Sequence, residues 1–191
     1  ISNDEIRPAI VVAVWMSDWA PGARGAEYMP QKALNEETWE RMQNDNPKWS
    51  AEAGGDRLSS DNYLKFLVNE LKPFVDATYR TLAGTADTFI MGSSMGGLIS
   101  AVAEYPDIFG GAACLSTDWT IGEGTVARWL KEYWPAPGAN RIYFDYGTET
   151  FDAYYEPYQQ QMDEAMREHG YTEDVDWVTR RFEGADHSAK S

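Results

Sequence analysis

A glycine-flanked serine stands where an apolar strand is expected to turn directly into a helix. Residues 87–92 are typical of a short strand, and the apolar run after them is typical of a helix that ends before Pro106. Between the two, Gly92-Ser93-Ser94-Met95-Gly96 matches the pattern G-x-S-x-G. This pattern makes a tight, strained turn, in which the flanking glycines let neighbouring backbone approach without a clashing Cβ. The motif therefore predicts an α/β fold with Ser94 exposed at one edge of its sheet.

Strand-like and helix-like patterns alternate along most of the chain. The expected strands are residues 9–15, 87–92, 111–116, 141–146 and 175–182. The expected helices are residues 59–79 (kinked at Pro73), 95–105, 126–133 and 152–169, the last ending at Gly170 as a left-handed cap. Residues 16–58 are typical of loops with one short helix. The alternation predicts a mostly parallel sheet with helices on both faces.

Composition narrows the class of protein. The chain has 191 residues, enough for a single domain spanning 1–191, and its net charge of −15 disfavours nucleic-acid and membrane-surface partners. No stretch is long and apolar enough to span a membrane, so a soluble protein is expected. The lone Cys114 excludes an intrachain disulfide and is expected to be a buried thiol. The two histidines exclude a His-rich metal site, and no cofactor is expected; compartment and oligomeric state are left open.

An exposed serine needs a base to become a good nucleophile, and only two histidines are available. His169 falls in the last turn of an expected helix, where a capping role accounts for it. His187 follows the last expected strand in a loop, so it comes after Ser94 in the order used by serine hydrolases of the α/β type. The sequence therefore predicts Ser94 as nucleophile and His187 as base.

The third member of such a triad is less well defined by the sequence. A carboxylate is expected after a strand that lies between Ser94 and His187. Asp152 is the first choice, Glu149 the second and Asp118 the third, although Asp152 would serve equally well as the N-cap of the following helix.

Several segments together resemble the α/β-hydrolase esterase family that includes esterase D, enterochelin esterase and feruloyl esterases. The matching segments are residues 10–15, 24–28, 70–74, 92–97 and 184–187. The resemblance implies an α/β-hydrolase fold with Ser94 and His187 as nucleophile and base. It also implies that the early strands, and the loop giving the second oxyanion amide, precede Ile1. Many relatives carry the acid as Gly-x-x-Asp, whereas Thr150 stands at that fourth position here, so the acid is either shifted to Asp152 or Glu149, or dispensable.

The expected activity is hydrolysis of a small-molecule ester through an acyl-enzyme on Ser94. The Met95 N–H is expected to be one oxyanion donor, and Arg24 and Trp119 are candidate substrate-binding residues. The substrate is expected to carry a small acyl, aryl or sugar-linked group. An acyltransferase with the same triad and a non-catalytic binding module on the same scaffold are the alternatives.

The chain is also rich in aromatic residues, with eight Trp and eleven Tyr. Some of them fall in or beside the long loop region expected to roof the cleft, while most are expected to pack in the core. The expected roof residues are Trp15, Trp19, Tyr28, Trp39 and Trp49.

Overall fold

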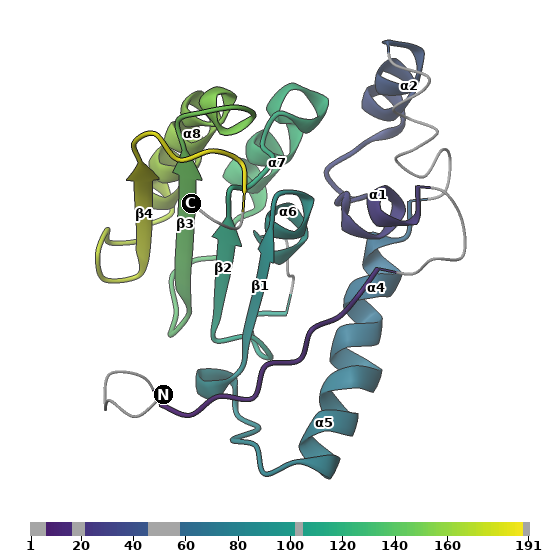
Figure 1. Cartoon of the computed structure of the whole chain (residues 1–191), viewed down its shortest axis with the longest axis vertical. Coiled ribbons are helices and arrows are strands. Elements are labelled where there is room, and N and C mark those ends of the chain that lie inside the picture. The colour runs from purple at the N-terminus through teal and green to yellow at the C-terminus, as the bar shows by residue number, and fades with distance from the viewer. Residues whose placement is uncertain (1–6, 17–21, 46–57, 102–104, 189–191) are drawn as a thin grey trace.

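Four parallel strands form the centre of the molecule, in the sheet order β1-β2-β3-β4 (Figure 1). The computed structural model describes residues 7–16, 22–45, 58–101 and 105–188. Its strands are β1 (Phe89–Ser93), β2 (Gly111–Leu115), β3 (Arg141–Gly147) and β4 (Trp177–Phe182). The four strands expected after residue 87 are therefore confirmed to within two residues at each end. Because all four run the same way, their carboxyl ends meet at one edge of the sheet.

Three helices follow the first three strands and pack on one face of the sheet. They are α6 (Met95–Ala101), α7 (Thr125–Tyr133) and α8 (Glu156–Glu168), with short 3-10 turns η3 (Ile121–Gly124) and η4 (Asp152–Tyr154) before the last two. The core beneath them is fully buried and mostly apolar, as at Leu98, Phe144 and Met162. On the opposite face, Phe89 and Met91 of β1 are exposed. Helices were expected on both faces, and the described helices that pack against the sheet lie on one.

A second group of helices extends beyond α6. The segments α4 (Ser60–Phe66), η1 (Leu67–Leu71) and α5 (Lys72–Thr78) run on continuously, and α4 also contacts α1 (Ala23–Tyr28). The expected bend near Pro73 takes the form of η1, a π-helical turn directly before it. Proline has no N–H and its ring crowds the carbonyl four residues earlier, and a π-helical turn changes the hydrogen-bond spacing just there.

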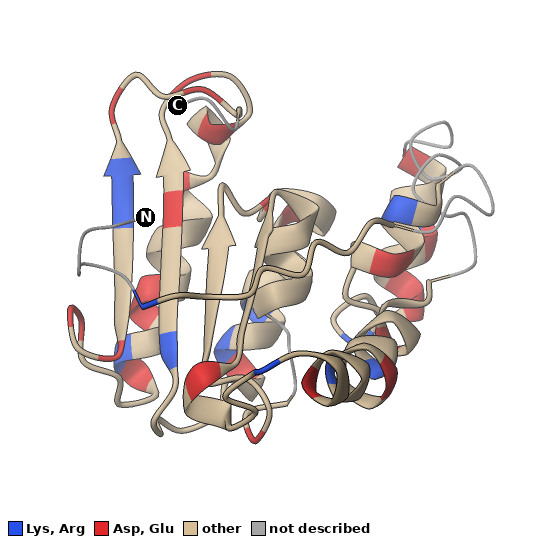
Figure 2. Ribbon diagram, turned by 60° about the horizontal axis from the view of Figure 1, so that its bottom comes forward, with Lys and Arg blue, Asp and Glu red and all other residues tan. Residues whose placement is uncertain are grey.

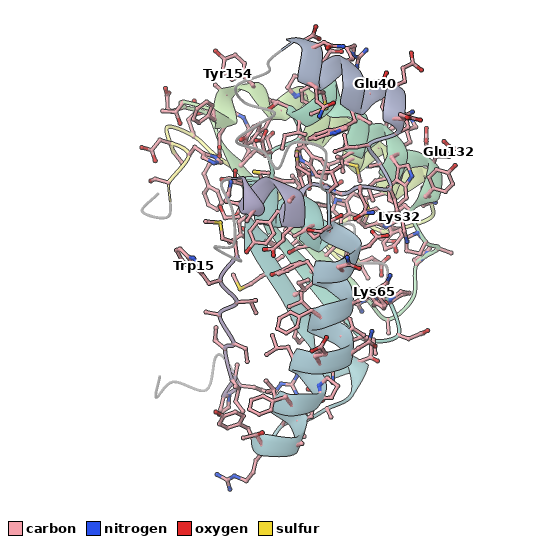
Figure 3. The ribbon with its side chains drawn as sticks, turned by 90° about the vertical axis from the view of Figure 1, so that its right-hand side faces the viewer. Trp15, Lys32, Glu40, Lys65, Glu132 and Tyr154 are labelled. Atoms are coloured by element: carbon pink, nitrogen blue, oxygen red, sulfur yellow. The ribbon has the colours of Figure 1, made fainter. Side chains whose placement is uncertain are left out.

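The expected strand at residues 9–15 is not formed. The described part of this segment has no strand hydrogen bonds, Val11 is 83% exposed and Trp15 82% exposed. Figure 3 shows Trp15 pointing away from the rest of the molecule. An apolar run becomes a strand only beside a hydrogen-bonding neighbour, and no described strand pairs with it. Downstream, the described residues of the 16–58 region (16, 22–45 and 58) include two short helices, α1 and α2 (Glu36–Asp45), where one was expected.

The cysteine and the acidic residues noted in the sequence can now be located. Cys114 is fully buried in β2, and burial together with the nearby Asp145 charge raises the pKa of its thiol. Asp and Glu residues are spread over the helices, the loops and a strand of the described part (Figure 2). None of the helices in the described part is long and apolar enough to cross a bilayer.

Candidate active site

Ser94 occupies a strained position between β1 and α6. Its φ is +60°, a left-handed conformation that non-glycine residues rarely adopt. Two backbone hydrogen bonds join this turn to the end of β2 and the loop after it. The Ser94 N–H donates to the Leu115 carbonyl at 2.9 Å, and the Ser94 carbonyl accepts from the Asp118 N–H at 3.3 Å. This geometry is that of a nucleophile elbow at the carboxyl edge of the sheet.

The two glycines of the motif differ in their steric role. A Cβ added to Gly92 would overlap the backbone carbonyl of Gly96, so only glycine fits there. A Cβ added to Gly96 would meet nothing within 4 Å among the described residues outside its own helix. Within the described structure, close backbone approach therefore explains the first glycine and not the second.

His187 and Asp152 are brought together above this edge. The His187 Nδ1 lies 2.5 Å from the Asp152 Oδ1. Asp152 is fully buried, and its other carboxylate oxygen accepts hydrogen bonds from the Ser116 hydroxyl and the Gly147 N–H, both at 2.7 Å. A buried carboxylate with three hydrogen-bonding partners is well suited to orient an imidazole and stabilise its charged form.

Two loops at this edge are bound to each other by backbone contacts. The N–H groups of Thr148 and Glu149 both donate to the Ala185 carbonyl at 3.0 Å. In return, the Gly184 N–H donates to the Thr148 hydroxyl at 2.7 Å, and the His187 N–H donates to the Thr150 hydroxyl at 2.9 Å. The loop after β3 thus holds the loop that carries His187.

The other two candidate acids lie differently. Glu149 is exposed, and its backbone N–H donates to the Ala185 carbonyl. Asp118 accepts a hydrogen bond from the Thr120 hydroxyl at 2.5 Å and lines a cavity beside the site. Asp152 makes no side-chain hydrogen bond that caps η4 or α8, so the N-cap interpretation does not describe it. The geometry favours Asp152 over both alternatives.

Two aromatic rings enclose the imidazole of His187. Phe151 and Tyr155 each lie with ring centroids 5.8 Å from it at an interplanar angle of 85°. Tyr155 is 2% exposed, and burial together with the charges of Asp118 and Asp152 raises the pKa of its hydroxyl. Tyr155 and the supporting Ser116 were not predicted. The available signal for Tyr155 was its place three residues after Asp152, since residues so spaced in a helical turn lie on one face.

A cavity of about 420 Å³ opens beside these residues. Its lining includes Asp118, Phe151 and Tyr155, and also Arg41 and Glu123, which form an ion pair at 3.5 Å. Phe151 and the neighbouring Tyr154 are 69% and 66% exposed, and Figure 3 shows Tyr154 at the surface. The cavity can therefore receive a small molecule beside Phe151 and Tyr155, the two residues whose rings pack against His187.

The candidate substrate-binding residues have separate environments. Arg24 is exposed on α1, and its guanidinium donates to the Met95 sulfur at 2.9 Å, so it lies beside the elbow. Trp119 is 1% exposed; its indole N–H donates to Gln159 at 2.8 Å and its ring packs near Phe144. Its ring is therefore part of the core and is not presented to the cavity.

The expected aromatic roof is only partly described. Tyr28 packs edge-on against Tyr63, Trp39 packs against the core, and Trp15 is exposed. Trp19 and Trp49 lie outside the described residues. These positions do not assemble a common aromatic surface in the described part.

The remaining sequence candidates are the second histidine, His169, and the side-chain types that can bind metal ions. His169 is the C-cap of α8, and its Nε2 lies 2.8 Å from the Lys131 carbonyl. Among the described residues, no group of three or more His, Cys, Asp or Glu side chains is arranged to hold a metal ion. Met95 begins α6, and the first amide of a helix has no acceptor within the helix.

A comparison with protein families gives a match over most of the chain. The family described as "Putative esterase" matches residues 25–188. The chain belongs to this esterase family. A curated relative, the uncharacterized protein YbbA of Bacillus subtilis (strain 168), is 23% identical to this esterase-family chain over 139 residues, covering 66% of the chain and 55% of YbbA.

Solved structures place the esterase-family chain in the α/β-hydrolase fold. Enterochelin esterase from Shigella flexneri is similar with a TM-score of 0.54 and 20% identity, over 67% of this chain and 33% of the other. A ferulic acid esterase is similar with a TM-score of 0.51 and 19% identity, over 66% of this chain and 54% of the other. An IroE-like serine hydrolase from Shewanella oneidensis is similar with a TM-score of 0.52 and 16% identity, over 85% of this chain and 50% of the other. The chain spans about half the length of YbbA and between a third and about half of these structures.

Proposed function

We propose that this chain is a serine carboxylic-ester hydrolase, with Ser94 as nucleophile, His187 as base and Asp152 as the acid that orients His187. The observation that carries the proposal is the buried Asp152–His187 hydrogen bond at the sheet edge where Ser94 forms a strained elbow. Tyr155 supports this arrangement, because its buried ring packs against the His187 imidazole. Family membership supports ester chemistry.

In the proposed reaction, the His187 Nε2 takes the hydroxyl proton of Ser94 as Oγ attacks the ester carbonyl carbon. The Asp152 carboxylate holds Nδ1–H and stabilises the imidazolium. The carbonyl oxygen becomes an oxyanion, and the Met95 N–H at the start of α6 is the proposed donor to it. The C–O ester bond then breaks, and the alcohol leaves with the proton from His187. Water attacks the acyl-Ser94 ester through the same steps, releasing the acid and restoring the serine.

The cavity lined by Asp118, Phe151 and Tyr155 is the proposed site for the substrate. A volume of about 420 Å³ accommodates a small acyl, aryl or sugar-linked ester, and the exposed rings of Phe151 and Tyr154 offer flat apolar surface to an aromatic or sugar ring. The names of the similar solved structures, ferulic acid esterase and enterochelin esterase, are consistent with aryl-containing substrates for those proteins. We therefore place acetyl, feruloyl and acetylated-sugar esters first in a substrate panel.

Mass spectrometry after treatment with a fluorophosphonate tests the nucleophile directly. We expect labelling at Ser94, abolished by Ser94→Ala and by His187→Ala, and a fall in ester hydrolysis of about 10⁴-fold or more for either variant. His169→Ala is the matched control, because it removes the other histidine from a helix end away from the site. Equal labelling of wild type and Ser94→Ala, or no labelling of wild type, would contradict the proposed function.

A further inference from the structure

One serine outside the proposed triad hydrogen-bonds to two carboxylates at once. Ser116 directly follows β2; its hydroxyl donates to the Asp152 Oδ2 at 2.7 Å, and its backbone N–H donates to the Asp145 Oδ1 at 2.9 Å. Asp152 is fully buried, and its other oxygen, Oδ1, lies 2.5 Å from the His187 Nδ1. Ser116 is therefore separated from the proposed base by a single side chain.

The chemistry of a carboxylate fixes the direction of the Ser116–Asp152 hydrogen bond. An ionised carboxylate only accepts, so the Ser116 hydroxyl gives its proton to Oδ2. The Gly147 N–H donates to the same oxygen at 2.7 Å. Oδ2 is thus held from the ends of both β2 and β3, while Oδ1 is left to His187. Because Asp152 is fully buried, water cannot easily replace a donor that is removed.

The end of the β2–β3 ladder explains how Ser116 is held. Leu115, the last residue of β2, is paired in register with Asp145 of β3. The next N–H, that of Ser116, lies beyond the last paired residue of β2, and the Asp145 side chain accepts it. The neighbouring strand therefore fixes the Ser116 backbone with a carboxylate, at the edge of the sheet where the site lies.

The Ser116 backbone is also strained. Its φ is +39°, a left-handed value that costs a residue with a Cβ some stability. Two other non-glycine residues with positive φ belong to the same site: Ser94 at +60° and Thr150, whose hydroxyl accepts from the His187 N–H, at +54°. Strained residues of this kind cluster at functional sites. Glycine would relieve the strain at Ser116 but would have no hydroxyl to give Asp152.

We propose that Ser116 is a positioning residue for Asp152, and through it for His187, an inference that rests on the proposed esterase function. The outer torsion of an aspartate side chain is broad, so a carboxylate with fewer partners can turn about its Cβ–Cγ bond. With Oδ2 held by Ser116, Oδ1 stays in line with Nδ1 while the imidazole takes up the Ser94 proton. Ser116 itself neither touches the substrate nor exchanges a proton.

Ser116→Ala removes the hydroxyl and keeps the Cβ. We expect kcat for a small ester and the rate of fluorophosphonate labelling each to fall about ten-fold, the effect of one hydrogen bond to a charged group, with KM unchanged. Ser60→Ala is the matched control, because Ser60 of α4 is 1% exposed and its hydroxyl accepts from the Gln31 N–H instead. It should leave both rates unchanged.

Ser116→Gly distinguishes positioning from a structural role. Alanine and glycine both lack the hydroxyl, so the two variants should have the same kcat within about two-fold. Glycine tolerates a φ of +39° and alanine does not, so the glycine variant should unfold about 2–4 °C above the alanine variant. A structural role would instead make kcat follow the unfolding temperature. Wild-type kcat in Ser116→Gly would overturn the proposal, even if Ser116→Ala does not fold.

A double-mutant cycle asks whether Ser116 acts through Asp152. In an Asp152→Ala background, Ser116→Ala should have no further effect on the residual labelling rate, because no carboxylate is left to hold. An equal ten-fold effect of Ser116→Ala in both backgrounds would contradict this positioning role.

The same labelling experiment separates this inference from the proposed function. If wild type and Ser116→Ala are labelled at Ser94 at the same rate, the positioning role is wrong and the esterase function stands. If wild type is not labelled at all, the proposed function fails first, and the role of Ser116 fails with it.

Discussion

Residues 9–15 and β2 are both short apolar runs, and only β2 is a strand. β2 pairs with β1 on one side and β3 on the other, and its Cys114 is fully buried. The 9–15 run is hydrogen-bonded to no described strand, and Val11 is 83% exposed. An apolar, β-branched sequence thus favours a strand, but it forms one only where neighbouring strands pair with it and cover its side chains. The same difference between buried and exposed positions can be tested with substitutions of single residues.

The largest expected effect comes from two carboxylates of one loop that differ in burial. Asp152→Asn should lower kcat/KM by about 10³–10⁴-fold, because the amide no longer stabilises the imidazolium and favours the wrong tautomer of His187. Glu149→Gln, the matched change at an exposed site, should leave kcat/KM within about two-fold of wild type. Steady-state kinetics on a small ester measures both. Comparable losses in the two variants would mean that burial does not identify the acid.

A second test compares apolar side chains of the paired and unpaired regions. Phe144→Ala should lower the free energy of unfolding by about 3–5 kcal/mol, because it leaves a cavity in the core beneath α6 and α7. Val11→Ala should change it by less than about 0.5 kcal/mol, as expected for an exposed side chain. Urea unfolding followed by circular dichroism gives both values. A loss of 2 kcal/mol or more at Val11 would show that the N-terminal run is covered in solution.

The smallest expected effect separates the two glycines of the elbow. Gly92→Ala should destabilise the fold by about 1–3 kcal/mol, because the new methyl group overlaps the Gly96 carbonyl and the backbone must shift. Gly96→Ala should be neutral or stabilising by up to about 1 kcal/mol, since the site is open and alanine favours the helix. Thermal unfolding of the two variants at one protein concentration provides the measurement. Equal destabilisation would contradict the steric distinction.

The sequence predicted the parts of the fold that depend on local pattern. Strands β1–β4 and the helices between them follow from apolar runs, from Pro106 and from Gly170, whose φ of +90° is the expected left-handed cap. Ser94 followed from glycine spacing. The parts that depend on distant partners were not predicted: residues 9–15 needed a neighbouring strand.

The candidate site shows the same division. Glu149, Asp152 and Asp118 each follow a strand, so sequence position alone could not rank them firmly. Burial and hydrogen bonds to Ser116, Gly147 and His187 distinguish Asp152, and these partners lie 5 to 36 residues away along the chain. Tyr155 was missed for the same reason, because its contact with the His187 ring exists only in three dimensions.

The hydrogen bonds that join residues 148–150 to the Gly184–His187 loop have a consequence for how this site can diverge. They hold the imidazole-bearing loop through backbone N–H groups, so the base keeps its place whichever carboxylate faces it. Thr150 stands where the family resemblance implied an acid, and its hydroxyl binds the His187 N–H instead. In the proposed triad, the carboxylate that faces His187 can therefore lie at another position of this turn while the backbone hydrogen bonds to the Ala185 carbonyl are kept.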